Sequence, residues 1–203
     1  MLRVGVLCSG GGTNLQALID AAKAGDLGAE IGLVIASKPD VYALKRAEEN
    51  GVPAVVIDRS QIKDRAAYTK KVAAALNGQG IGLAVFAGWT VILTNDFFAD
   101  FKGGSINVHP ALLPAFGGKG FYGMKVHEAV LAAGVKVSGA TVHFVTEEVD
   151  GGAIILQKAV DVRENDTPET LQRRVMEEAE WVILPEAVRL YAQGKLGSVP
   201  TIE

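Results

Sequence analysis

Runs of apolar residues alternate with amphipathic segments over the first half of the chain. Four runs rich in Val, Ile, Leu and Ala are separated by three segments with helical spacing. The runs cover residues 3–8, 31–37, 54–58 and 82–88, and the helical segments cover residues 14–23, 41–49 and 66–76. This alternation predicts βαβ units, and therefore an open, mostly parallel, twisted α/β sheet of Rossmann-like type with helices on both faces.

The pattern changes after Gly88. A short run over residues 105–110 and a glycine-rich segment precede two longer apolar runs, residues 137–145 and 153–160, which the segment EEVDGG separates. Such a pair predicts an antiparallel, hairpin-like addition to the sheet. A last helix should begin after Thr167, a capping residue, and Pro185 should kink it or end it because proline lacks an amide hydrogen.

Length and charge narrow the class of protein. The 203 residues fit a single domain over residues 1–203, and 49% hydrophobic residues are enough for a sizeable core. The net charge of −3 provides no basic surface for nucleic acid. One cysteine, Cys8, and a short apolar N-terminus are typical of a cytoplasmic protein without a membrane segment.

A glycine-rich loop, Ser9 to Asn14, lies between the first predicted strand and helix. Backbone amides and the helix dipole at such a place favour an anion, and a tight turn without a ligand is the equally weighted alternative. A dinucleotide fingerprint would need glycine where Leu15 stands, and no Walker sequence follows. The pattern therefore favours a phosphate monoester.

A polar cluster is predicted in the second half. Asn107 and His109 share one face of a short strand, at the edge where open α/β sheets bind ligands. Asp150 precedes two glycines in a turn. If Asp150 approaches His109, its charge should raise the pKa of the imidazole, and Asn107 with a protonated His109 would donate to an oxyanion. A structural histidine and a turn-forming aspartate are the alternatives.

The sequence contains no nucleophile elbow, and Cys8 lies in an apolar run, so the nucleophile is expected to come from a substrate. The three histidines lack metal-ligand spacing, and no metal is expected. We expect structural or supporting roles for His127 and His143.

Several segments together resemble the phosphoribosylglycinamide formyltransferase family of de novo purine synthesis. They are SGGGTNLQAL, FAGW followed by IL, INVHPALLP and TVHFVTEEVDGGAIILQ, in the family's order and at about its spacing. The resemblance implies the formyltransferase fold. It also implies direct attack by the amine of glycinamide ribonucleotide on the formyl carbon of 10-formyltetrahydrofolate.

The resemblance also implies a role for individual residues. The catalytic residues would be Asn107, His109 and Asp150, and the phosphate would bind Gly12, Thr13 and Asn14. The folate would contact Arg65, Thr90, Val91, Ile92, Leu93 and Asn107, with its pterin near residues 146–150.

Three departures from the family pattern leave questions open. Thr90 and Val91 stand where many members have Met-Arg, which makes folate affinity uncertain. The loop of residues 115–126 is longer than in short-loop members, and is either a mobile flap or an ordinary surface loop. The acidic residue that the family places in the last helix is either Glu178 or Glu180, because the spacing to Pro185 is one residue longer here.

Other functions remain as alternatives. Formyltetrahydrofolate hydrolase and methionyl-tRNA formyltransferase share the Asn, His and Asp chemistry, but they usually carry an additional regulatory or RNA-binding domain. A non-catalytic sensor of a phosphorylated ligand would need the glycine loop alone. The sequence does not decide the oligomeric state, and a homodimer is one possibility.

Overall fold

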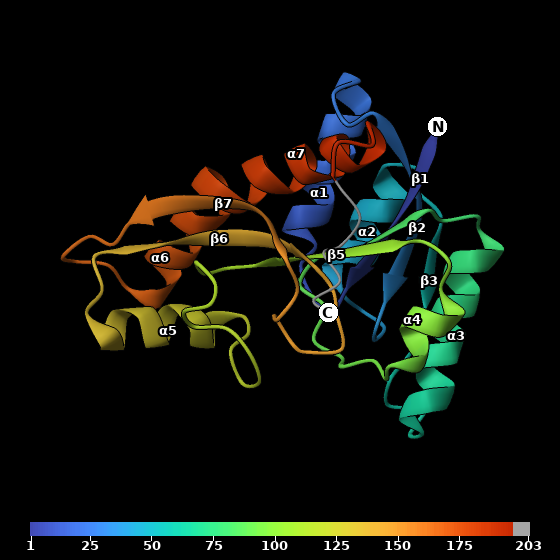
Figure 1. Cartoon of the computed structure of the whole chain (residues 1–203), viewed down its shortest axis with the longest axis horizontal. Helices are drawn as coiled ribbons and strands as arrows, with labels where there is room; N and C mark the ends of the chain where they lie inside the picture. The colour runs from blue at the N-terminus through green and yellow to red at the C-terminus, as the bar shows by residue number, and fades with distance from the viewer. Residues whose placement is uncertain (197–203) are drawn as a thin grey trace. The chain divides into compact units, whose positions relative to one another are not determined.

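The computed structural model describes residues 1–196, which form two compact units that divide after Ile106 (Figure 1). The seven strands follow the order β3-β2-β1-β4-β5-β6-β7. In the first unit the elements are β1 (Leu2–Cys8), α1 (Thr13–Ala24), β2 (Ala29–Ala36), α2 (Tyr42–Glu49), β3 (Ala54–Val56), α3 (Arg65–Gly78), β4 (Leu83–Phe86) and α4 (Asp96–Asp100). Strand β5 (Gly104–His109) continues into the second unit. The expectation of a single domain stays a prediction.

The first unit has the predicted doubly wound topology. Strand β1 pairs in parallel with β2 on one side and with β4 on the other, and β2 pairs in parallel with β3. The chain therefore moves outward from β1 to β3 and then returns past β1 to β4. Right-handed crossovers place α1 and α2 on one face and α3 on the other. The loops after β1 and β4 meet where the strand order reverses, the usual ligand site of such sheets.

Close packing of α3 on β1 depends on a glycine. Strand β1 is covered on both faces, and its residues from Val4 to Cys8 are buried, as expected for a central parallel strand. A Cβ atom at Gly5 would lie 2.5 Å from the Leu76 Cδ2 atom of α3 and 3.1 Å from Ile81 Cγ2. The absent side chain lets the helix approach the strand.

The second unit contains α5 (Met124–Ala133), β6 (Val137–Phe144), β7 (Ile154–Asp161), α6 (Pro168–Val175), a π-helical turn (Met176–Glu180) and α7 (Trp181–Ala192). Strands β6 and β7 pair antiparallel, which confirms the predicted addition to the sheet (Figure 1). The start of α6 is also as predicted, because the Thr167 hydroxyl accepts from the Thr170 amide in a capping box.

The last helix does not end at Pro185, which lies inside α7. The regular pattern is interrupted earlier instead, by the π-helical turn that ends at Glu180. A π turn adds one residue to a helix. It therefore accounts for the extra residue before Pro185 that left Glu178 and Glu180 undecided. Glu180 is buried and Glu178 is exposed.

Within residues 1–196, helix α3 is as long as any, at 14 residues. About 20 apolar residues are needed to cross a bilayer. None of the helices in this part of the chain is long and apolar enough to do so.

A double-mutant cycle would test the packing of α3 on β1. Gly5→Ala should lower the free energy of unfolding by about 1–3 kcal/mol through overpacking, and Leu76→Ala by about 2–5 kcal/mol through a cavity. In the double variant the new methyl group occupies that cavity, so the combined loss should be smaller than the sum. Urea unfolding measures all four proteins. Simple additivity would show that the two side chains do not compete for this space.

Candidate active site

The glycine loop forms the start of α1. Gly12 is the N-cap residue, in the left-handed region at φ +70°, and its carbonyl accepts from the Gln16 amide at 3.0 Å. Gly10 and Gly11 are exposed, whereas Asn14 is buried. The loop thus presents backbone at the positive end of a twelve-residue helix, an arrangement suited to an anion. The assignment of the phosphate to Gly12, Thr13 and Asn14 remains a prediction.

The predicted folate residues of the first unit lie on neighbouring elements. The Ser9 hydroxyl accepts from the Thr90 amide at 3.0 Å, so the loop after β4 is joined to the glycine loop. At the other end of this segment, the Thr94 amide donates to the Thr69 hydroxyl of α3 at 3.0 Å. Helix α3 begins at Arg65, which is exposed. The structure therefore brings Arg65 and residues 90–93 to adjoining segments.

The apolar residues of this segment are not core residues, although their sequence alone resembles a core. Ile92 is 47% exposed, and Val91 and Leu93 are half-buried. Exposed apolar side chains beside backbone polar groups are typical of a wall that contacts a ligand. Their part in folate binding stays a prediction.

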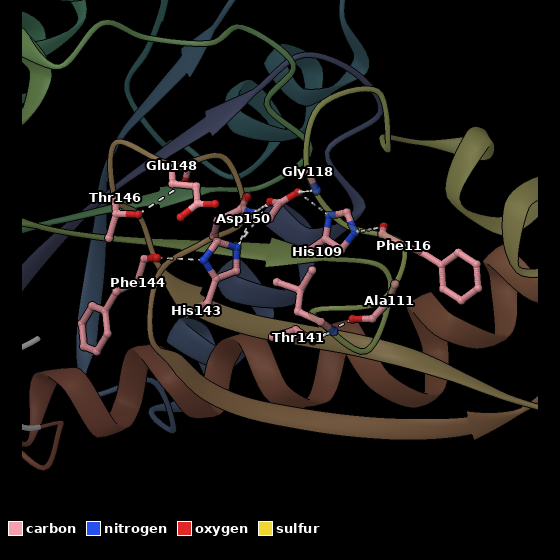
Figure 2. Close-up of polar contacts among 12 residues, drawn as sticks. His109, Ala111, Phe116, Gly118, Thr141, His143, Phe144, Thr146, Glu148 and Asp150 are labelled. Atoms are coloured by element: carbon pink, nitrogen blue, oxygen red, sulfur yellow. Dashed lines mark hydrogen bonds and ion pairs between the residues drawn. The ribbon is translucent and has the colours of Figure 1, made fainter. Parts of the chain in front are cut away.

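In the second unit, the three predicted catalytic residues converge, and His143 joins them. Figure 2 shows His109, His143 and Asp150 of this cluster. Asp150 lies between the two histidines. Its Oδ2 atom is 3.5 Å from His109 Nδ1, and its Oδ1 atom is 3.5 Å from His143 Nε2. Asn107 Nδ2 lies 3.0 Å from His143 Nε2 and 3.4 Å from Asp150 Oδ1. Strand β5 supplies Asn107 and His109, β6 supplies His143, and the turn before β7 supplies Asp150.

His143 is the member of this cluster whose part the sequence did not reveal. Its side chain is 2% exposed, and its Nδ1 atom lies 2.8 Å from the Phe144 carbonyl oxygen. Since a carbonyl only accepts, Nδ1 carries the proton, and in the neutral ring Nε2 accepts from Asn107. Both Nδ2 protons of Asn107 are then used, on His143 and Asp150. The available signal was its position at the end of a strand, seven residues before Asp150.

Asp150 is held by its own turn and by surrounding donors. Its backbone is in the left-handed region at φ +58°, which aspartate tolerates better than most residues. Oδ2 accepts from the Gly118 amide at 2.9 Å. Burial alone would raise the pKa of Asp150, but its contacts with His143 and His109 and the hydrogen bond from the Gly118 amide together lower it. The carboxylate is therefore ionised at neutral pH.

The expected rise in the pKa of His109 is wrong. Asp150 does approach, and together with the Phe116 carbonyl it raises the pKa, but the burial of His109 lowers it by more, and the nearby His143 lowers it further. The resting imidazole is therefore neutral at pH 7. Its Nε2 lies 2.8 Å from the Phe116 carbonyl oxygen, so Nε2 is the protonated nitrogen of the neutral ring.

The loop of residues 115–126 is tied to the cluster through the Phe116 carbonyl and the Gly118 amide. Its start is anchored as well, because the Thr141 hydroxyl accepts from the Leu113 amide at 3.0 Å and donates to the Ala111 carbonyl at 2.7 Å. These contacts argue against an independent surface loop. Its movement as a flap stays a prediction.

The structure gives little support to covalent chemistry at Cys8. Burial raises the pKa of the Cys8 thiol to about 12, so the thiolate that a nucleophile requires does not form near neutral pH. Among residues 1–196, no three His, Cys, Asp or Glu side chains are grouped so as to hold a metal ion.

Comparison with known proteins gives a consistent result. The family model described as Formyl transferase matches residues 2–188. The phosphoribosylglycinamide formyltransferase of Haemophilus influenzae is 38% identical over 196 residues, covering 97% of this chain and 90% of that protein. The trifunctional purine biosynthetic protein adenosine-3 of Gallus gallus is 45% identical over 95% of this chain. The chain spans about a fifth of the length of that protein, of which the match covers 19%.

Solved structures agree in fold. The glycinamide ribonucleotide transformylase 1 of Symbiobacterium toebii superimposes with a TM-score of 0.92 at 42% identity, covering 98% of this chain and 92% of that one. The phosphoribosylglycinamide formyltransferase of Coxiella burnetii, solved in complex with CHES, has a TM-score of 0.88 at 37% identity, covering 97% and 90%. The expected formyltransferase fold is confirmed.

Two neighbouring glycines provide a test of the turn that holds Asp150. A Cβ atom at Gly152 would lie 1.8 Å from the Phe144 carbonyl oxygen, whereas one at Gly151 would meet only the flexible side chain of Glu148. Gly152→Ala should therefore lower the free energy of unfolding by about 1–3 kcal/mol, and Gly151→Ala by much less. Urea unfolding compares the two. Equal losses would mean that contact with Phe144 does not determine the path of the turn.

Stability should fall in acid because of His127. This side chain on α5 is 1% exposed, and burial together with His109 lowers its pKa from 6.5 to about 4. A folded-state pKa below the unfolded value means that the unfolded chain takes up the proton first. The free energy of unfolding is thus highest above pH 6.5 and should decrease by about 3 kcal/mol from this group as the pH falls to 4.

The measurement is urea unfolding of wild type and His127→Gln between pH 4 and 7.5. The variant should lose less stability over this interval, whatever its absolute stability. Parallel pH profiles would show that His127 is not the group that titrates.

Proposed function

Since this chain belongs to the phosphoribosylglycinamide formyltransferase family, we propose that it transfers a formyl group from 10-formyltetrahydrofolate to the amine of glycinamide ribonucleotide, in de novo purine synthesis. The formyltransferase family implies a formyl donor, and the reduced folate is the proposed one. The observation that carries the proposal is the convergence of Asn107, His109 and Asp150 in a chain that matches a full-length relative almost from end to end.

Asn107 and His109 would stabilise the oxyanion of the tetrahedral intermediate. The Asn107 amide gives its second proton to Asp150 over 3.4 Å, the longer of its two contacts, which an oxyanion can replace at little cost. His109 donates from Nε2 to the neutral Phe116 carbonyl. A charged oxyanion is the stronger acceptor and would compete for that proton. No covalent enzyme intermediate is needed, because the substrate amine is the nucleophile.

The neutral resting state of His109 fits the proton transfers that this reaction requires. The amine gains a positive charge when it attacks the formyl carbon, and it must then lose a proton. Since Nε2 of the neutral ring is already protonated, the imidazole would accept that proton at Nδ1, where the ionised Asp150 stabilises the resulting imidazolium at 3.5 Å. The imidazolium would then give a proton from Nε2 to the departing folate nitrogen. The burial that keeps His109 neutral therefore prepares it to act as a base first and an acid second.

Substrate binding is proposed for the residues that the family pattern indicates. The phosphate would bind Gly12, Thr13 and Asn14, and the folate would contact Arg65, residues 90–93 and Asn107. Of the two acidic residues near the last helix, we assign the glycinamide end to Glu180, because it is buried and Glu178 is exposed. The substitution of Met-Arg by Thr90-Val91 leaves an uncharged wall beside Ile92.

Location and assembly stay predictions. A cytoplasmic location is proposed, although the relatives from Arabidopsis thaliana and Vigna unguiculata are named chloroplastic. The proposed partners are small molecules only, with no nucleic acid, membrane or metal. Whether the protein forms a homodimer is an open question.

A spectrophotometric assay tests the proposed activity. Purified protein, glycinamide ribonucleotide and a 10-formyl folate should give rapid deformylation, which should stop when the ribonucleotide is omitted. His109→Ala should reduce turnover by about 10² to 10³, the usual effect of losing an oxyanion donor. Glu128→Gln, an exposed change on α5, serves as the matched control and should keep wild-type turnover.

The other outcomes point to the alternative functions. Deformylation that does not depend on the ribonucleotide would indicate a hydrolase. Ribonucleotide binding without any deformylation would indicate a sensor. Full activity in His109→Ala would remove this histidine from the mechanism.

A further inference from the structure

The glycine loop rests on helix α2, and the contact is centred on Arg46. The Arg46 Nε atom donates to the Gly11 carbonyl at 2.9 Å, and Nη1 donates to the Gln16 side chain of α1 at 3.2 Å. The guanidinium also lies over the Tyr42 ring, 4.9 Å from its centre. The half-buried Arg46 therefore joins the loop, the first turn of α1 and the start of α2.

A second hydrogen bond also joins a carbonyl of the glycine loop to α2. The Ala43 amide donates to the Gly10 carbonyl at 3.2 Å, so two consecutive loop carbonyls point toward α2. A Cβ atom at Gly12 would lie 2.8 Å from Ala43 Cβ, which shows how closely the loop lies against the helix. The loop can adopt this position only because residue 12 has no side chain.

The direction of these carbonyls determines the direction of the next amides. In a trans peptide the C=O bond and the following N–H bond point in opposite directions. With the carbonyls of Gly10 and Gly11 toward α2, the amides of Gly11 and Gly12 point away from it. Two successive amides with one direction form a concave donor site of the kind that binds anions.

We infer that Arg46 is a positioning residue for the phosphate of the substrate, acting through the Gly11 carbonyl to orient the loop amides. The inference rests on the proposed function. It assigns Arg46 no contact with the phosphate, and its positive charge lies behind the loop on the α2 side. Loss of its hydrogen bond frees the peptide between Gly11 and Gly12 to rotate, so the effect falls on phosphate recognition rather than on the formyl transfer step.

Steady-state kinetics of three variants test this role. Arg46→Met keeps much of the side-chain stem but removes both donors, and it should raise KM for glycinamide ribonucleotide about tenfold. Turnover and KM for the formyl folate should stay near wild type. Arg46→Lys retains the charge without the Nε geometry and should be intermediate. The matched control is Lys45→Met, which removes a neighbouring exposed positive charge from the same helix and should leave KM unchanged.

The dephosphorylated riboside separates positioning from a general structural effect. The riboside should react slowly with wild type and equally slowly with Arg46→Met. It makes no phosphate contact with the loop, so the change at Arg46 has no interaction to weaken. If Arg46→Met reduces kcat/KM for the riboside as much as for the ribonucleotide, or if KM for the ribonucleotide does not change, the inference is wrong.

Inorganic phosphate provides a test that needs no activity. Phosphate should raise the Tm of wild type and Lys45→Met, and it should raise that of Arg46→Met by less at the same concentration. An equal increase in all three proteins would overturn the inference. Wild-type protein that responds to phosphate but does not react with the ribonucleotide would overturn the proposed function and leave the role of Arg46 in anion binding supported.

Discussion

The candidate site depends on one buried carboxylate. The side chain of Asp150 is only 10% exposed, and an ionised group at such a place is costly unless donors surround it. Asn107 and the Gly118 amide donate to the carboxylate, and one ring nitrogen of His109 and one of His143 lie 3.5 Å from it, so that two strands and a loop meet at this group. The positions of these groups are therefore linked through one buried negative charge.

Two glycines allow the loops of the candidate site to lie close against neighbouring segments. Gly12 lets the glycine loop lie against Ala43, and Gly152 lets the turn after Asp150 lie against the Phe144 carbonyl. In each case a side chain would occupy the space that another segment fills. The proposed catalytic residues are polar, but the paths of the loops around them depend on glycines.

Burial and charge compete at His109, and the outcome determines its chemistry. The charge of Asp150 favours the imidazolium, whereas removal of the ring from water disfavours it by more. A permanently protonated ring could only donate. A neutral ring beside an ionised carboxylate can accept a proton and return it, which is what the proposed transfer of a formyl group between two nitrogens requires.

The local pattern of the chain was sufficient for most of the fold. Apolar alternation predicted the strands and the helices of the first unit, and Thr167 predicted the start of α6, because these depend on neighbours close in sequence. The short helix α4 was missed, since five residues are too few to show a period. The π-helical turn before Trp181 was also missed, although the extra residue before Pro185 was visible.

The candidate site also divides into features that the sequence predicted and features that only the structure showed. The residue types and motif spacing of the sequence by itself indicated Asn107, His109 and Asp150, the glycine loop and the family. Only the tertiary structure brought His143 and the Gly118 amide to Asp150, placed Arg46 beneath the glycine loop and exposed Ile92. It also reversed the expected direction of the shift in the pKa of His109. The reason is physical. The sequence shows which side chains are present and how they are spaced along the chain. The burial of a side chain and its distance from other groups depend on residues that are far away in sequence.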